Sequence, residues 1–101
     1  MISPDNYYCK ASAADVLERI VIFIEETTKL PHISVAEVVD HHHFADLYEP
    51  HINRRRQMLE VTQMLQDDGW RRSRRRGLSY QPDGTYVNSI TTRWFPPTET
   101  E

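Results

Sequence analysis

The residues of this sequence best suited to chemistry are arginines gathered in one stretch. Eight arginines and no lysine lie between residues 54 and 76, among the acidic residues Glu60, Asp67 and Asp68. The planar guanidinium fork of arginine matches phosphate oxygens and the edges of nucleic-acid bases. The stretch therefore predicts contact with an anionic partner. The alternative is a solvated face whose charges pair with acidic residues elsewhere in the fold.

The distribution of charge along the chain sharpens this expectation. The net charge is −3, which taken alone argues against a nucleic-acid binder. However, residues 1–53 hold nine acidic and three basic residues, whereas residues 54–101 hold six acidic and nine basic residues. Such an asymmetry tells more about partners than the sum does.

Other residues that could support chemistry form weaker patterns. His41, His42 and His43 are consecutive, and consecutive side chains at a helix end point in different directions, so we expect no shared metal ion. Cys9 is the single cysteine and cannot form an internal disulfide, which makes a cytoplasmic location the default. No nucleophile–base pair and no pair of carboxylates has the spacing of a catalytic site, so we expect neither an enzyme nor a cofactor.

The length of 101 residues predicts one domain. We expect an irregular arm over residues 1–11, a folded domain over 12–97 and a frayed polar tail over 98–101. The longest apolar run is Ile20–Ile24, far short of the roughly 20 residues that cross a bilayer. The N-terminus does not resemble a secretory leader, so neither export nor membrane contact is expected.

Capping residues and apolar periodicity predict three helices, over residues 12–28, 34–43 and 54–68. One further helical turn is expected over 44–48. The third helix should turn Met58, Val61, Thr62 and Leu65 inward and leave Arg54, Arg55, Gln57 and Gln63 outside. The expected shared core consists of Ile20, Phe23, Ile24, Val38, Met58 and Leu65.

Strands are predicted after the third helix. The arginine-rich segment 70–76, which has no helical face, should form the first strand, and residues 85–87 and 90–95 are rich in β-branched and aromatic side chains. The chain would then be mainly α with a small β-hairpin, in the order of a three-helix winged helix-turn-helix. In that fold the third helix is the recognition helix and the hairpin is the wing.

Two segments also carry a resemblance to known proteins. The stretch "INRRRQMLEVTQMLQDDGWRRSRRR" followed by "TRWFPP" resembles winged-helix domains at the C-terminal tails of phage and mobile-element primase-helicases of the virulence-associated E type. The resemblance spans about residues 34–97, with Leu65, Gly69-Trp70 and Trp94-Phe95-Pro96 at the matching positions. The resemblance implies a winged-helix fold and a nucleic-acid role. Together with the placement of the arginines, it leads us to expect duplex DNA binding in transcription regulation or in phage or mobile-element replication. The chain lacks a nucleotide-binding loop motif, so any helicase activity would belong elsewhere.

These arguments select candidate DNA-binding residues at two places. At the start of a recognition helix, side chains can reach base edges in the major groove, whereas wing residues contact phosphates. Strand alternation sends Arg71, Ser73 and Arg75 to the opposite face from the even-numbered arginines, so not all can meet one duplex. The candidates are Arg54, Arg55 and Gln57 on the helix and Arg72, Arg74, Arg75 and Arg76 on the wing.

Alternatives remain for each part of this interpretation. The first-turn arginines Arg54–Arg56 could instead form ion pairs with Asp46 and Glu49. Trp70 and Trp94 could stack on bases, or they could seal the wing onto the third helix. The whole domain could dock on a protein without binding DNA, and the first helix could pair two copies into a homodimer.

Overall fold

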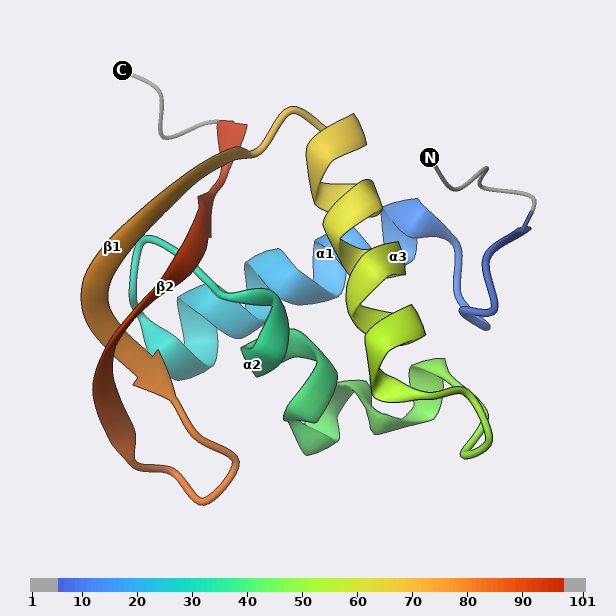
Figure 1. The fold of residues 1–101 in the computed structure, drawn as a ribbon, viewed down its shortest axis with the longest axis horizontal. Helices are drawn as coiled ribbons and strands as arrows, with labels where there is room; N and C mark the ends of the chain where they lie inside the picture. The colour runs from blue at the N-terminus through green and yellow to red at the C-terminus, as the bar shows by residue number, and fades with distance from the viewer. Residues whose placement is uncertain (1–5, 98–101) are drawn as a thin grey trace.

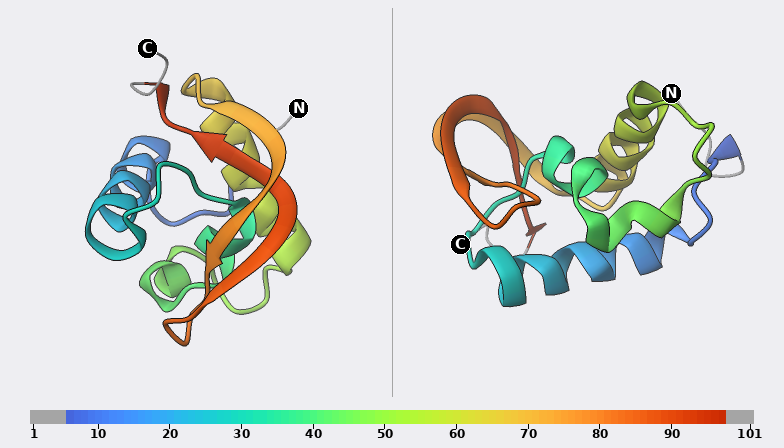
Figure 2. Two further views of the ribbon diagram at one scale, coloured as in Figure 1. Left: turned by 90° about the vertical axis from the view of Figure 1, so that its left-hand side faces the viewer. Right: turned by 90° about the horizontal axis from the view of Figure 1, so that it is seen from below.

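A computed structural model describes residues 6–97, with the backbone alone at positions 42, 43 and 45. The predicted tail 98–101 and the first five residues of the predicted arm lie outside the described part. Three helices and one antiparallel two-stranded hairpin form a small helix-plus-sheet domain (Figure 1). Helix α3, helix α2 and the hairpin face the viewer of Figure 1, and α1 lies behind them, as the right-hand view of Figure 2 shows from below.

The helices begin where their capping residues predict. Helix α1 (Ala13–Phe23) starts after Ser12, whose hydroxyl accepts from the backbone N–H of Asp15 at 3.2 Å, and it continues as a wider π turn, η2 (Ile24–Thr28). Helix α2 (Val35–Asp40) is followed by a 3-10 segment, η3 (His42–Leu47), which confirms the expected extra turn. Helix α3 (Arg54–Asp67) has Asn53 as its cap.

Gly69 follows α3 with a φ of 88°, in the left-handed region that glycine adopts at low cost. The chain then enters strand β1 (Arg71–Tyr80) and returns along β2 (Tyr86–Phe95). Both strands are longer than the sequence predicted, and the two segments expected at 85–87 and 90–95 form one continuous strand. Their register pairs Arg72 with Trp94 and Arg76 with Ile90. The hairpin is strongly curved and wraps around the segment between η2 and α2 (Figure 2).

The core lies where α1, α2 and α3 meet the root of the hairpin. Met58 is only half-buried, packed at the edge of the core, while the other five predicted core residues are buried: Ile20, Phe23, Ile24, Val38 and Leu65. Trp70 and Trp94 also belong to the core, with 5% and 3% of their surface exposed. This burial agrees with a packing role for the two tryptophans and removes them as base-stacking platforms.

The buried side of α3 differs from the predicted one. Gln63, predicted to lie outside, is buried and donates to the Asp67 carboxyl at 2.7 Å, whereas Thr62, predicted to lie inside, is only half-buried. The helix is therefore rotated relative to the prediction. Its buried residues are Glu60, Val61, Gln63, Met64 and Leu65.

Two interactions attach the hairpin to the helical body. Ile33, between η2 and α2, pairs with Trp94 through two backbone hydrogen bonds of 3.0 and 2.8 Å. The buried carboxyl of Glu37 accepts from the backbone and side chain of Ser34 at 2.8 and 3.0 Å, completing a capping box, and from the backbone N–H of Tyr80 at 2.6 Å. One side chain thus caps α2 and fixes the end of β1. Within residues 6–97, each helix is too short or too polar to cross a bilayer.

The Glu37 contacts predict a large effect on stability. Replacing Glu37 with alanine leaves buried donors of Ser34 and Tyr80 without their acceptor, which should lower the free energy of unfolding by about 2–3 kcal/mol. Chemical denaturation followed by tryptophan fluorescence measures this change. The matched control is Glu18→Ala on the exposed side of α1, expected to stay within about 0.5 kcal/mol of the parent. Equal effects of the two substitutions would contradict the bridging role of Glu37.

Candidate nucleic-acid interface

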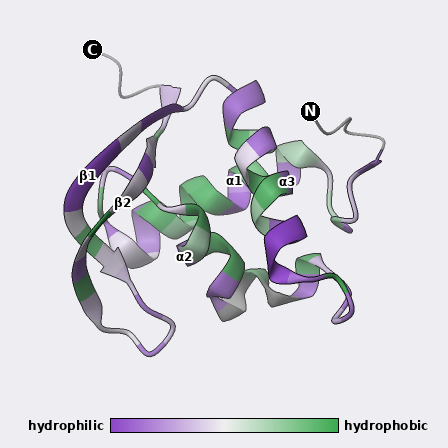
Figure 3. Cartoon of the chain, in the orientation of Figure 1, coloured by the Kyte–Doolittle hydropathy of each residue, from purple (hydrophilic) through white to green (hydrophobic). Residues whose placement is uncertain are grey.

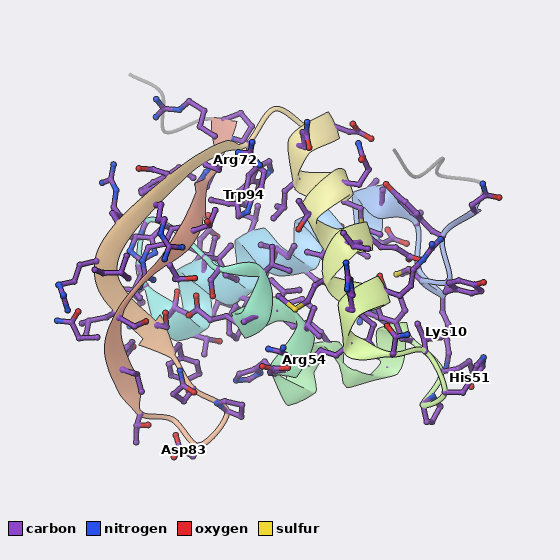
Figure 4. The ribbon with its side chains drawn as sticks, in the orientation of Figure 1. Lys10, His51, Arg54, Arg72, Asp83 and Trp94 are labelled. Atoms are coloured by element: carbon purple, nitrogen blue, oxygen red, sulfur yellow. The ribbon has the colours of Figure 1, made fainter. Side chains whose placement is uncertain are left out.

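Arg54 is held by a neighbouring helix. Its Nε and Nη2 each donate to one oxygen of the Asp40 carboxyl at 2.8 Å, and this pairing raises the pKa of Arg54. Asp40 ends α2 and Arg54, labelled in Figure 4, begins α3, so the bidentate pair links these two helices. The predicted ion-pair partners were the wrong acids, because Asp46 bonds Arg19 and Glu49 bonds Lys10.

Arg56 points to the other side of α3. Its Nε donates to Glu60 at 2.8 Å, its Nη2 donates to the carbonyl of Asn6 at 2.8 Å, and its guanidinium lies 4.8 Å from the centre of the Tyr8 ring. Arg56 therefore fastens the N-terminal segment onto the third helix.

Glu60, which the sequence left unassigned, organises this corner of the domain. It is fully buried and accepts from the backbone N–H groups of Tyr8 and Cys9 and from the hydroxyl of Tyr48, at 2.8–3.2 Å. Burial raises the pKa of Tyr48 far above its usual range and also raises the pKa of the Cys9 thiol. Cys9 is thus poorly suited to act as a nucleophile, since the thiolate is the reactive form.

Arg55 and Gln57 have different surroundings. Gln57 is half-buried, and its side-chain amide donates to the carbonyl of Ile52 at 2.8 Å, so it is tied to the loop before α3. Arg55 is exposed and forms no hydrogen bond or ion pair within residues 6–97. Among the three helix candidates, Arg55 is therefore the one whose charge is open to a partner.

The exposed arginines of β1 occupy two faces of the hairpin. Arg72, Arg74 and Arg76 alternate onto one face, opposite Trp94, Thr92 and Ile90, and form no hydrogen bond or ion pair within the described chain. Arg75 lies on the other face, where it donates to Ser73 Oγ at 3.3 Å and covers the Phe95 ring at 4.9 Å. The first half of β1 and the first turn of α3 are strongly hydrophilic in Figure 3.

A hollow of about 330 Å³ lies between α3 and the hairpin. Met58 and Thr62 line it from α3, and Arg72 and Trp94 line it from the two strands (Figure 4). Thr91 and Thr92 of β2 and the start of α2 complete its wall. The open arginine Arg72 thus borders the groove between the third helix and the hairpin.

Arg93 is a structural residue of this region that sequence reasoning missed. It is fully buried, and its guanidinium donates to the carbonyls of Gly77, Leu78 and Ser89 at 2.7–3.0 Å and to the Ser79 hydroxyl at 3.1 Å. Burial lowers its pKa, against the opposing effect of the Glu37 charge. A β-carbon at Gly77 would lie 3.2 Å from Arg93 Nε, which explains the glycine there. A charged residue inside a predicted strand gave no signal of burial.

Of the three consecutive histidines, the structure describes the side chain of His41 alone, because those at positions 42 and 43 lie outside the described part. His41 is buried against Phe23 and Tyr80, with ring centres 4.7 and 5.5 Å away. No group of three potential ligands that could hold a metal ion is present among the described residues.

No family model matches the chain, and comparisons with curated proteins and with solved structures also find no match. Arguments about function therefore depend on the geometry above.

His32 gives this region a dependence on pH. Its Nδ1 is buried without a hydrogen-bond partner in the described chain, and its ring meets Phe95 edge-on at 5.5 Å. Burial lowers the pKa of His32, and the positive charges of Arg93 and Arg75 lower it further. The folded protein therefore resists protonation of His32, whereas the unfolded chain takes up a proton near pH 6.5.

Stability should consequently fall as the pH drops below about 6.5 and should level off below the lowered folded-state pKa. Replacing His32 with glutamine should reduce this fall, measured as the change in unfolding free energy between pH 7.5 and 5.5. The control is His51→Gln at an exposed histidine, which should keep the parent's response. Identical responses in the parent and His32→Gln would contradict the assignment.

Proposed function

We propose that this domain binds duplex DNA, with the outer face of α3 and the hairpin as a winged helix-turn-helix. The observation that carries the proposal is the set of exposed arginines on β1 that have no acidic partner within the described chain, Arg72, Arg74 and Arg76. In a chain of net charge −3, acidic side chains were available, yet they pair with Lys10, Arg19, Arg54 and Arg56.

The attachment of the hairpin supports this proposal. A wing contributes more to affinity when it is already held beside the recognition helix, because ordering a mobile hairpin on binding costs conformational entropy. The Ile33–Trp94 backbone pairing and the Glu37–Tyr80 hydrogen bond provide that attachment. A role in phage or mobile-element replication, or in transcription regulation, remains part of the proposal and depends on the resemblance described above.

The arrangement favours phosphate contacts over base contacts. Arg55 is the open arginine on α3, since Arg54 and Arg56 are engaged within the protein and Gln57 is tied to a loop carbonyl. Phosphate contacts position a protein on DNA but carry no sequence information. We therefore propose binding with weak sequence preference.

The exposed apolar side chains of the hairpin favour a second candidate function. Leu78, Val87 and Ile90 are 42–51% exposed. Leu78 and Ile90 lie on the same strand face as Arg74 and Arg76, and exposed apolar residues grouped on a surface are typical of protein-docking sites. Val21 and Ile22 are likewise exposed on α1, where a homodimer contact was predicted. Docking on a protein, without DNA, is therefore the alternative to duplex binding, and neither candidate requires catalysis or a cofactor.

The test is a salt titration of binding to a fluorescent duplex. The double variant Arg74→Ala/Arg76→Ala should bind at least about 10-fold more weakly at low salt and should flatten the slope of log affinity against log salt by about 2, because each lost phosphate contact contributes about 0.9. Duplexes of unrelated sequence should respond alike. Arg55→Ala should weaken binding without changing the fold.

The matched control is Arg19→Ala, which removes an exposed arginine from the opposite side of the molecule, where it pairs with Asp46 at 3.1 Å. This variant should bind as the parent does. Absence of duplex binding by the parent at low salt, or equal losses in Arg19→Ala and the hairpin variant, would overturn the DNA proposal and favour protein docking.

A further inference from the structure

A second basic hollow lies at the root of the hairpin and shares Arg72 with the groove described above. It has a volume of about 460 Å³, within the range of roughly 300–1,000 Å³ typical of small-ligand sites. It is lined by Pro31, Arg71, Arg72, Ser73, Arg75 and Phe95. No acidic side chain belongs to this described lining.

The hollow combines a flat aromatic surface with positive charge. The Arg75 guanidinium lies over the Phe95 ring, 4.9 Å from its centre, and donates to Ser73 Oγ. His32 meets the same ring edge-on. An unpaired base can stack on the outer face of a guanidinium that lies on an aromatic ring, while Arg72 in the same lining attracts the adjoining phosphate. The carboxylates of an acidic peptide would use the charge but would bring no ring to stack.

One duplex cannot occupy both faces of the hairpin. Ser73 and Arg75 alternate with Arg74 and Arg76, so their side chains leave opposite faces of the strand. A duplex in the groove beside α3 meets the even-numbered arginines, and Arg75 remains unused by it. Arg72 lines both hollows, so a strand that leaves the groove passes Arg72 before it reaches Phe95.

We propose that the hollow around Phe95 and Arg75 binds an unpaired nucleotide, so that the domain recognises a junction between duplex and single-stranded nucleic acid. The duplex half of this proposal rests on the proposed function. The nucleotide site itself rests on the second hollow alone.

The experiment compares a blunt duplex with the same duplex carrying a short 5′ or 3′ overhang, by fluorescence anisotropy at fixed salt. An overhang should tighten binding by at least about 5-fold, because one base stacked on an aromatic ring contributes that much. An overhang of abasic sites keeps the phosphates and should lose most of the gain. Phe95→Leu should remove the gain and leave blunt-duplex affinity unchanged.

Ser73→Asp provides a second variant, at a half-buried residue that lines the hollow, where a substitution carries little risk to folding. The new carboxylate repels phosphate. It too should remove the gain, whereas Arg74→Ala, on the opposite face, should weaken all duplexes and preserve the ratio between overhang and blunt ends. A free single strand added as competitor reports the nucleotide site without the duplex site.

The outcomes separate the two proposals. If blunt duplex binds but overhangs add nothing, or if the gain survives in Phe95→Leu and Ser73→Asp, the nucleotide site is wrong and the duplex function stands. An abasic overhang as effective as a normal one also overturns the stacking site. If blunt duplex fails to bind while single strands bind in a Phe95-dependent manner, the duplex function is wrong and the nucleotide site stands.

Discussion

The buried guanidinium of Arg93 is the interaction on which the hairpin depends. Unpaired carbonyl groups cannot be left inside a protein without a cost of about 1–3 kcal/mol each, and a tightly curved two-stranded ribbon turns several of them inward. Arg93 supplies donors for the carbonyls of both strands, and Gly77 leaves room for it. Without the hydrogen bonds from Arg93, these inward-facing carbonyl groups would be unpaired and the curved form of the hairpin would be destabilised. The curvature in turn sets the directions in which the exposed arginines of β1 point.

Two buried carboxyl groups perform the corresponding task for the helices. Glu37 joins the start of α2 to the end of β1, and Glu60 joins α3 to the N-terminal segment and to Tyr48. A domain of 101 residues has a small apolar core, and apolar contacts alone tolerate several arrangements of short helices. Hydrogen bonds with defined donors and acceptors select one of them, since a partly satisfied buried polar group is costly.

The sequence predicted the order and the start of the helices and strands better than it predicted which of their side chains are buried. Local signals mark the helix starts at Ser12, Ser34 and Asn53 and the end of α3 at Gly69, so these were found. The buried side of α3 was predicted only in part: Val61 and Leu65 are buried as expected. Glu60 was missed because it is polar by type, and the donors that satisfy it come from residues about 50 positions away. The part of β1 that was missed begins at Gly77, because glycine favours turns and the long-range contact with Arg93 that makes glycine necessary there has no local signal. Pairing with β2 and the buried Arg93 stabilise the strand instead.

In the candidate site too, features set by neighbouring residues were predicted, and features set by residues far away in the sequence were missed. Strand alternation correctly separated Arg74 from Arg75, because that geometry is local. Which arginines would be neutralised could not be read from spacing, since Asp40 and Glu60 reach Arg54 and Arg56 through the packing of the helices. The acidic residues thus form their ion pairs mainly within the helical body. The even-numbered arginines of β1 have no acidic partner among the described residues, although the net charge of the chain is negative. At physiological salt, charges more than about 8–10 Å away are largely screened. An anionic strand close to this surface would therefore respond to the nearby arginines more than to the negative net charge of the chain.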